Sequence, residues 1–190
     1  MKIRRKAWKV LAVGAALATL QMTALAQEKN KGWMPDSVSA EYGFGPHVEM
    51  VRAAVQWDWN KQWLSTGGWS LGGYWDLNVM QWKGDKYKNV RGKDQDITSI
   101  GITPVFRWQR NDKKGFYVEG GIGANLLSET YNNAGNKNGT LFQFGDHLGL
   151  GYVFGSGVDL GVKYQHFSNG GMSDDNDGVN FTVVRLLYQF

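Results

Sequence analysis

The sequence predicts an all-β protein: an eight-stranded antiparallel transmembrane β-barrel of the outer membrane. Three observations lead to this fold class. The chain opens with a secretory leader, the rest is filled by short strand-like runs of alternating polarity, and the connections between these runs differ in length in a regular way. Bacterial outer-membrane barrels combine alternating strands with short turns at one end and longer loops at the other. A helical membrane protein would instead need apolar segments of about 20 residues.

The leader is Met1–Ala26. It begins with several Lys and Arg residues, continues with the apolar run Val10–Leu20 and ends in an Ala-Leu-Ala sequence. This arrangement is typical of a cleavable signal peptide, and we expect cleavage after Ala26. The remaining residues, 27–190, are expected to form one barrel domain.

Composition excludes several functions. Five of the 21 Lys and Arg residues lie in the leader, which leaves 16 basic against 17 acidic residues, so no charge supports nucleic-acid binding. The chain has no cysteine, and therefore no disulfide and no cysteine metal site. The spacing of Asp174, Asp175 and Asp177 matches no calcium-binding loop. We expect neither a metal nor a cofactor.

The first four predicted strands lie between residues 38 and 108. Val38–Phe44 alternates apolar residues with Ser, Glu and Gly. Glu49–Trp59 sets Val, Ala and Trp against Arg, Gln and Asp. Trp69–Trp82 sets Trp, Leu and Val against Ser, Asp and Asn, and Thr98–Trp108 sets Ile, Phe and Trp against Ser, Thr and Arg. A period of two residues is that of a strand with two different faces.

The last four predicted strands follow the same rule. Phe116–Leu126 and Phe142–Phe154 each carry a Phe-rich and Leu-rich face opposite a few polar residues and several glycines. Val158–Ser168 alternates Val, Leu and Tyr with Asp, Lys and Gln. Asn180–Phe190 closes the chain, with Arg185 on the mixed face.

The two faces of these strands indicate which side meets lipid. The mixed faces carry charges of both signs: Glu41, Arg52, Asp58, Asp76, Arg107, Glu119, Lys163 and Arg185. Such charges can pair with one another in a narrow lumen, and an interior of eight strands is filled by side chains, so a pore is not expected. The apolar faces end in an aromatic girdle: Trp57, Trp59, Trp69, Trp108, Phe154 and Tyr188. Aromatic girdles mark membrane interfaces.

Connection lengths predict the orientation. The shorter connections are Asn60–Gly68, Asn111–Gly115 and Gly155–Gly157, and the longer ones are Lys83–Ile97, Leu127–Leu141 and Asn169–Val179. We therefore expect periplasmic termini and external longer loops. The external connection Gly45–Val48 is short and departs from this trend.

His166 and Ser168 continue the apolar face of Val158–Ser168 at its external end. A His and a Ser two residues apart on one face of a strand can act as base and nucleophile. By this parity both face the lipid. The alternative is a polar pair at the interfacial end of a strand, where polar side chains cost little.

Asp146 interrupts the apolar face of Phe142–Phe154. If Phe154 pairs with Val158 across the turn, Asp146 lies directly opposite His166, with the two Cβ atoms about 5 Å apart. A lone carboxylate facing lipid is expensive and suggests a function. Asp146 is thus a candidate for supporting His166, and the alternative is an interfacial residue capped by loop groups.

The loop that begins at Lys83 is rich in basic residues. Lys83, Lys86, Lys88 and Arg91 lie close together in it, interspersed with aspartates. Such side chains could bind the phosphates of an anionic lipid. The alternative is an ordinary solvated loop.

The segment His166-Phe167-Ser168-Asn169, followed by Asn176-Asp177-Gly178 and a terminal strand, resembles the PagL-type lipid A 3-O-deacylases. With the leader and the eight strands, the resemblance covers essentially the whole chain. It implies the following site: Ser168 as nucleophile, His166 as base, Gly171 and Asn176 as the oxyanion hole, and Asn169 as a supporting residue. The family places an acid where this chain has Asn180, and this departure makes Asp146 the alternative source of charge.

The resemblance implies an outer-membrane esterase that removes the 3-O-linked acyl chain of lipid A. Lipid A, or lipopolysaccharide, would be the substrate, outer-membrane lipids of a Gram-negative bacterium would surround the multi-pass barrel, and a homodimer is compatible with the family. Two alternatives are a non-enzymatic structural or adhesive barrel and a lipid A acyltransferase. An acyltransferase would need an apolar slot inside the barrel, which the charged mixed faces disfavour.

Overall fold

The computed structural model of the chain describes residues 32–190, and the predicted leader Met1–Ala26 lies outside this range. Eleven strands run through the described residues. They are β1 (Ser37–Gly45), β2 (Val48–Asp58), β3 (Trp63–Thr66), β4 (Trp69–Gly84), β5 (Gln95–Arg110), β6 (Gly115–Leu127), β7 (Tyr131–Asn133), β8 (Asn136–Asn138), β9 (Phe142–Val153), β10 (Val158–Ser168) and β11 (Val179–Gln189). No helix among the described residues is both long and apolar enough to cross a membrane.

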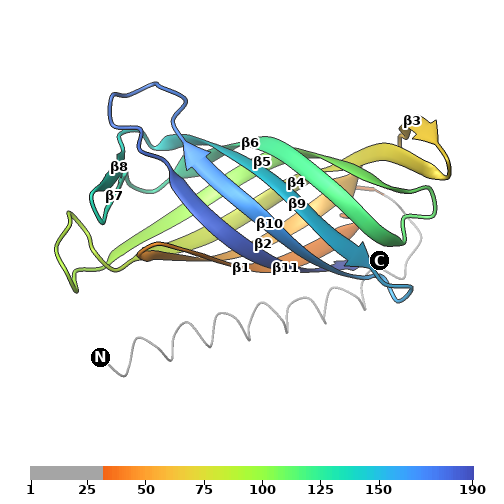
Figure 1. The fold of residues 1–190 in the computed structure, drawn as a ribbon, viewed down its shortest axis with the longest axis horizontal. Helices are drawn as coiled ribbons and strands as arrows, with labels where there is room; N and C mark the ends of the chain where they lie inside the picture. Colours follow the sequence, from red (N-terminus) through yellow and green to blue (C-terminus); the bar gives the residue numbers. More distant parts are fainter. Residues whose placement is uncertain (1–31) are drawn as a thin grey trace.

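Eight of these strands form a closed antiparallel barrel, which confirms the predicted fold class. The order around the wall is β1, β2, β4, β5, β6, β9, β10 and β11, and pairing of β1 with β11 and of β2 with β4 completes the ring (Figure 1). The short strand β3 adds to one end of β4, and β7 and β8 form a separate hairpin at the other end. All neighbours in the barrel wall are sequence neighbours apart from these insertions and the closing pair.

The barrel has two unlike ends. We call the turn end the one that holds Ser37, Gln189 and the connections 59–68, 111–114 and 154–157. The loop end holds the connections 46–47, 85–94, 128–141 and 169–178. The predicted strands all occur, but β4 and β5 run further towards the loop end than expected, because the pairs Lys83↔Asp96 and Gly84↔Gln95 continue their ladder through polar residues. The β7–β8 hairpin was not predicted.

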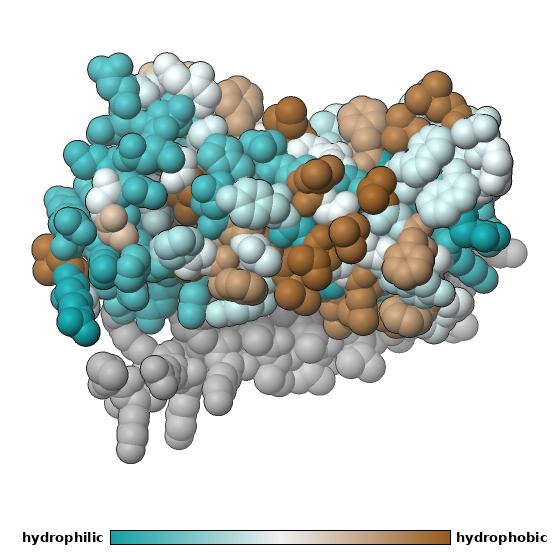
Figure 2. All heavy atoms as spheres, in the orientation of Figure 1, coloured by the Kyte–Doolittle hydropathy of each residue, from teal (hydrophilic) through white to brown (hydrophobic). Residues whose placement is uncertain are grey.

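The outer wall is apolar. Ile122, Leu148 and Leu150 are 65%, 72% and 60% exposed on it. Figure 2 shows hydrophobic residues gathered over the middle of the wall and towards the turn end, while the loop end is mainly hydrophilic. Apolar out and polar in is the arrangement of a membrane barrel and the reverse of a soluble one.

The turn-side part of the lumen is filled by paired charges. Arg52 bonds to Glu41 at 2.5 Å and to Asp76. The Glu119 carboxylate forms ion pairs with Arg107 and Arg185, each at 2.7 Å. Arg107 also forms an ion pair with Asp159, at 2.9 Å. Arg107–Asp159 and Arg185–Glu119 join strands that are not neighbours in the wall, whereas the two pairs of Arg52 join neighbouring strands. Pairing of this kind is expected from the mixed faces of the sequence.

The loop-side part of the lumen is apolar instead. Trp82 lies at its centre, with its ring 4.7 Å from that of Phe167 and 5.2 Å from that of Phe181. We call the whole cluster the apolar plug: Val48, Met50, Met80, Trp82, Ile97, Leu127, Tyr131, Phe167, Val179, Phe181 and Val183. The sequence does not reveal this cluster, because charged residues on the same inward faces make these faces look mixed throughout.

Candidate active site

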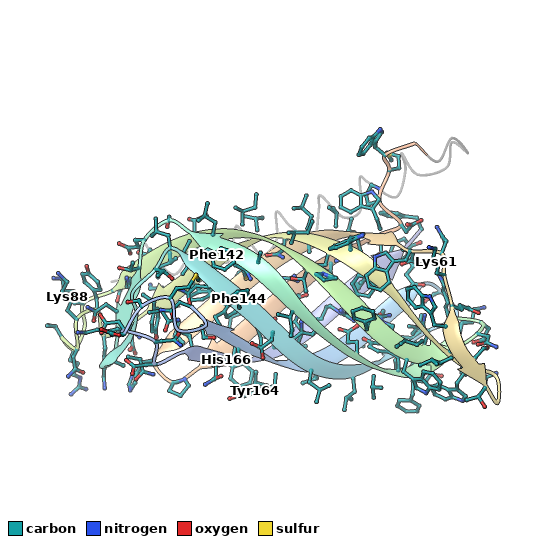
Figure 3. All side chains as sticks on the ribbon, turned by 90° about the horizontal axis from the view of Figure 1, so that it is seen from above. Lys61, Lys88, Phe142, Phe144, Tyr164 and His166 are labelled. Atoms are coloured by element: carbon teal, nitrogen blue, oxygen red, sulfur yellow. The ribbon has the colours of Figure 1, made fainter. Side chains whose placement is uncertain are left out.

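His166 and Ser168 lie at the loop-side end of β10, on the outer side of the barrel. Both are half-buried, whereas Phe167 between them is 2% exposed and belongs to the apolar plug. The strand alternation therefore fixes the direction of both candidate residues from within, through the residue that separates them. Figure 3 shows His166 with Tyr164 and Phe144 towards the loop end, and Phe144 pairs directly with Ser168.

The ring of His166 is held by Asn180 on the neighbouring strand. The two residues are register partners, and His166 Nδ1 lies 2.7 Å from Asn180 Oδ1. An amide oxygen can only accept a hydrogen bond, so Nδ1 is the donor in this contact and Nε2 is left available to act as acceptor. Asn180 thus sets the tautomer that a general base requires. This is the position at which a carboxylate was expected.

Gly178 makes room for the His166 ring. A Cβ atom added at residue 178 would lie 2.5 Å from His166 Cε1, and the backbone there has φ of +75°. Both the space and the left-handed backbone conformation favour glycine. The loop 169–178 therefore returns close against the imidazole before β11 begins.

Asp146 has the register that the sequence predicts. Phe154 N–H bonds to Val158 O at 2.7 Å across the turn, and Asp146 is the direct partner of His166. Within residues 32–190, however, the Asp146 carboxylate makes no side-chain hydrogen bond. Asp146 therefore lies beside His166 on β9, on the opposite side from Asn180 on β11, and its role stays a prediction.

The loop 169–178 is organised by Asn169, a fully buried residue. Its backbone N–H donates to Asn176 Oδ1 at 2.8 Å, and its side-chain Oδ1 accepts from Gly171 N–H at 2.9 Å. The first bond fixes the orientation of the Asn176 amide, so that the Nδ2 donors are the part of Asn176 left for a ligand. The second bond engages one of the two predicted oxyanion donors, Gly171, in a contact within the loop.

Asn138 on β8 ties this loop to the β7–β8 hairpin. It is completely buried, accepts from Gly178 N–H at 2.9 Å and donates to Gln143 Oε1 at 2.9 Å. Asp177 adds two bonds to the hairpin residue Lys137, at 2.8 and 2.9 Å. Asn138 could not be found from the sequence, because a polar residue in a loop without clear periodicity gives no signal of where its side chain points.

The basic loop is partnered by other groups at the loop end. Lys86 Nζ lies 3.0 Å from His47 Nε2, Lys83 pairs with Asp94 at 3.4 Å, and Lys88 lies over the ring of Tyr87. In Figure 3, Lys88 lies further out along the barrel than His166. The binding of lipid phosphates by Lys83, Lys86, Lys88 and Arg91 stays a prediction.

The fold and the candidate site define a class: a small integral outer-membrane β-barrel that has a histidine and a serine on the outer side of one strand. The chain belongs to the lipid A 3-O-deacylase (PagL) family, whose model matches residues 49–189. It is 32% identical over 183 residues to the lipid A deacylase PagL of Bordetella bronchiseptica, covering 92% of each chain. It is 34% identical over 172 residues to that of Pseudomonas aeruginosa, covering 89% of this chain and 90% of the relative.

Solved structures agree with this assignment. The crystal structure of the outer membrane enzyme PagL matches with a TM-score of 0.70 and 29% identity, over 81% of this chain and 99% of that one. The outer membrane protein Ail of Yersinia pestis matches with a TM-score of 0.51 at 11% identity, over 81% and 97% of the two chains, and shares the fold alone. The barrel and the family place the chain in the Gram-negative outer membrane, and the family makes it a hydrolase.

Proposed function

We propose that this chain hydrolyses the 3-O-linked acyl ester of lipid A, with Ser168 as nucleophile and His166 as general base on the lipid-facing wall. The observation that carries the proposal is the bond of 2.7 Å between His166 Nδ1 and Asn180 Oδ1. It leaves Nε2 as the basic atom of an imidazole that sits two residues from a serine on the same face. The family membership supplies the substrate class.

The first half of the reaction forms an acyl-enzyme. His166 Nε2 takes the proton of the Ser168 hydroxyl while Ser168 Oγ bonds to the ester carbonyl carbon. The tetrahedral intermediate then collapses, its bond to the sugar oxygen breaks, and the imidazolium of His166 protonates that leaving oxygen. In the described part of the chain the Ser168 hydroxyl has no hydrogen-bond partner. Contacts between a nucleophile and its base are often completed only when substrate binds.

The oxyanion of the intermediate needs donors in place beforehand. Asn176 offers its Nδ2 group, because Asn169 N–H fixes the amide through Oδ1. Gly171 N–H is the second donor. In the structure it donates to Asn169 Oδ1, and on substrate binding this hydrogen bond would become bifurcated or be replaced by one to the oxyanion. Asn169 thus supports both donors, by orienting one and by holding the other until substrate arrives.

The second half of the reaction repeats the same steps with water. Water gives a proton to His166 Nε2 and attacks the acyl carbon, and Ser168 Oγ leaves and regains a proton. The products are a free fatty acid and a lipid A with one ester-linked chain fewer. A site on the outer wall at the loop end, which lies outside the cell by the loop-length rule, meets the leaflet that contains lipid A.

The test is mass spectrometry of lipid A from cells that express the chain. We expect the loss of one ester-linked hydroxyacyl chain with wild type. Ser168→Ala should lower this activity by at least about 10³-fold, because the nucleophile is removed. Ser156→Ala, the same change in the connection 154–157 at the turn end, is the matched control and should keep full activity.

Heat-modifiable migration on gels shows that each variant is a folded barrel. Deacylation retained in folded Ser168→Ala would rule out Ser168 as nucleophile. A lipid A that gains a chain would indicate an acyltransferase, and an unchanged lipid A in cells and in detergent would favour the structural barrel.

A further inference from the structure

The connections at the loop end differ in charge according to their place around the barrel. Connection 85–94 carries four basic residues against two acidic ones, whereas connection 169–178, which borders the candidate active site, carries three aspartates and no basic residue. β4, which leads into connection 85–94, is four strands from β10 in either direction around the ring. Figure 1 shows the two connections leaving the loop end on opposite sides. The basic connection thus borders a different part of the membrane from His166 and Ser168.

A hollow lies between connection 85–94 and the turn that joins β1 to β2. Its volume of about 470 Å³ is within the usual range of small-ligand pockets. It is lined by His47, Asp85, Lys86, Arg91, Gly92 and Asp94. All six residues belong to connections 46–47 and 85–94, so the hollow is separate from the candidate active site.

The hollow contains basic groups whose charges are not paired. Lys86 Nζ lies 3.0 Å from His47 Nε2, and His47 Nδ1 lies 2.9 Å from Asp85 Oδ1. An ammonium group can only donate, so Nε2 is the acceptor in the first contact and Nδ1 the donor in the second. Asp94 pairs with a lysine of β4 at 3.4 Å. Among the described residues no carboxylate forms an ion pair with Lys86 or Arg91.

The backbone around the hollow is fixed from below by Asn133 of β7. This residue is completely buried, accepts a hydrogen bond from Lys86 N–H at 2.7 Å and donates one to His47 O at 2.7 Å. Gly84 makes room for it, because a Cβ there would lie 2.6 Å from Asn133 Oδ1. A surface loop held in this way keeps its charged side chains in a set arrangement, which lowers the entropic cost of binding a ligand.

We propose that the hollow binds a phosphate group of a second lipopolysaccharide molecule, which is not the molecule that is cleaved. The Lys86 ammonium and the Arg91 guanidinium supply charged donors, and a guanidinium can form two parallel bonds to a phosphate. Lys88 and Lys93 lie 5.3 and 5.1 Å from the centre of the Tyr87 ring and add positive charge at the rim. By the loop-length rule this end lies in the outer leaflet, where lipopolysaccharide is the phosphorylated neighbour.

The position of the hollow explains why the lipid is a second molecule. A lipid whose ester lies at Ser168 rests against β10, half the ring away from β4. The strand spacing and tilt make the barrel roughly 16 Å across its backbone, and the apolar plug fills its loop-side interior. The aspartates of connection 169–178 repel phosphates on the side of the active site. This inference needs an outer-membrane barrel but no hydrolysis, so it goes beyond the proposed function.

Solution NMR tests the proposal without turnover. Wild type in detergent micelles is titrated with lipid A from which mild alkali has removed the ester-linked chains, so that no ester remains to be cleaved. The amide signals of His47, Lys86 and Gly92 should shift and reach saturation, while those of residues 169–178 should stay in place. The same lipid without its phosphates should shift none of them. Equal shifts from both lipids would overturn a phosphate site.

Two further probes separate the possible sources of phosphate. A phosphate monoester, as in lipid A, has more charge and more free oxygens than the phosphodiester of phosphatidylglycerol. Phosphatidylglycerol and inorganic phosphate should therefore bind the hollow at least about 10-fold more weakly. Equal affinity for either would overturn the assignment to lipopolysaccharide. If one saturation curve moved residues 169–178 together with His47, the lipid would be the reacting molecule, and the second site would be wrong.

The variant Lys86→Gln/Arg91→Gln removes both charged donors. Its affinity for the alkali-treated lipid A should fall by at least about 10-fold, because each charge-assisted bond contributes substantially to binding. Arg110→Gln/Lys114→Gln makes the same change of charge at the turn end and is the matched control, with wild-type affinity expected. Heat-modifiable migration shows that both variants are folded. A folded Lys86→Gln/Arg91→Gln barrel with wild-type affinity would overturn the hollow as the binding site.

Discussion

The two parts of the barrel interior are built from opposite chemistry. The turn-side part holds buried charges, four acidic and four basic among the described residues: Glu41, Asp76, Glu119, Asp159, Arg52, Arg107, Lys163 and Arg185. The loop-side part is the apolar plug around Trp82, which contains no charge. Only the plug lies behind the candidate site, where Phe167 separates His166 from Ser168 and where Val179 and Phe181 flank Asn180.

This difference assigns separate tasks to the two parts. Some of the paired buried charges link strands that are not neighbours in the wall. Removing one partner of a pair is costly because it leaves the other charge buried and unpaired. Close-packed apolar side chains give each neighbouring outward residue a fixed direction, since a packed interior resists small shifts. We therefore expect the charged part to govern stability and the apolar plug to govern both stability and catalysis.

The largest expected effect comes from breaking the charged part. Glu119→Gln leaves Arg107 and Arg185 without the carboxylate that each now contacts at 2.7 Å. We expect a loss of about 3–5 kcal/mol in the free energy of unfolding. Urea titration of the barrel in detergent, followed by tryptophan fluorescence, measures it.

Molecules of Glu119→Gln that remain folded should have the wild-type deacylation rate, because the charged part does not contact the site. Asp112→Asn, in an exposed turn, is the control and should leave stability unchanged. A Glu119→Gln barrel that is folded but inactive would contradict the idea that the charged part of the lumen governs stability and not catalysis.

The next effect comes from the apolar plug. Phe167→Leu removes part of a side chain that packs on Trp82 and Phe181, and it should cost about 1–2 kcal/mol of stability. It should also lower kcat by about 10-fold or more, because the cavity lets His166 and Ser168 move. Phe116→Leu, on the outer wall at the turn end, is the matched control. An unchanged kcat in Phe167→Leu would show that the plug only fills space.

A smaller effect is expected where the hairpin meets the site loop. Asn138→Ala leaves Gly178 N–H buried without its acceptor, which should cost about 1–2 kcal/mol. Since Gly178 touches the His166 ring, deacylation should fall as well, by about 10-fold. Asn136→Ala, an exposed residue of the same hairpin, should behave as wild type. Hydrogen exchange at residues 169–178 would show loosening in the first variant only.

Much of the fold could be predicted from the sequence because a strand in a membrane barrel has a strict period of two. The same period, with one assumed turn between Phe154 and Val158, gave the correct partner of His166. The alternation of the strands could not predict contacts between loops, which follow no repeating pattern. The docking of Asn138 on Gly178 and the bond between Gly171 and Asn169 join loops, whose side-chain directions follow from no repeating pattern.

The apolar plug was missed for a different reason. Met50, Met80 and Trp82 have inward parity, but charged residues on the same faces make these faces look mixed along their whole length. Position along the strand mattered as much as parity.

Charge offers a last comparison between the inside and the outside of the wall. The charges in the lumen are paired, whereas Asp146 lies half-buried on the outer side next to Leu148, without a hydrogen bond among the described residues. A carboxylate in an apolar wall costs free energy, and such residues in membrane proteins usually have a function. The register of Asp146 fits one function: its carboxylate can stabilise the imidazolium of His166 that forms when Ser168 is deprotonated. Asn180, a neutral amide, orients the ring.

The smallest effect, and the sharpest test of this comparison, is therefore Asp146→Asn. An oriented imidazole stays in place, so only the through-space attraction is lost, and kcat should fall by about 10-fold, equivalent to about 1.4 kcal/mol. Asn180→Ala should instead release the Nδ1 proton from its acceptor and affect both tautomer and direction. If the two residues act on one imidazole, the double variant should lose less than the product of the single losses. Asp146→Asn at the wild-type rate would leave Asp146 as an interfacial residue, and Asn180→Glu would then be expected to raise kcat by supplying the missing charge at the orienting position.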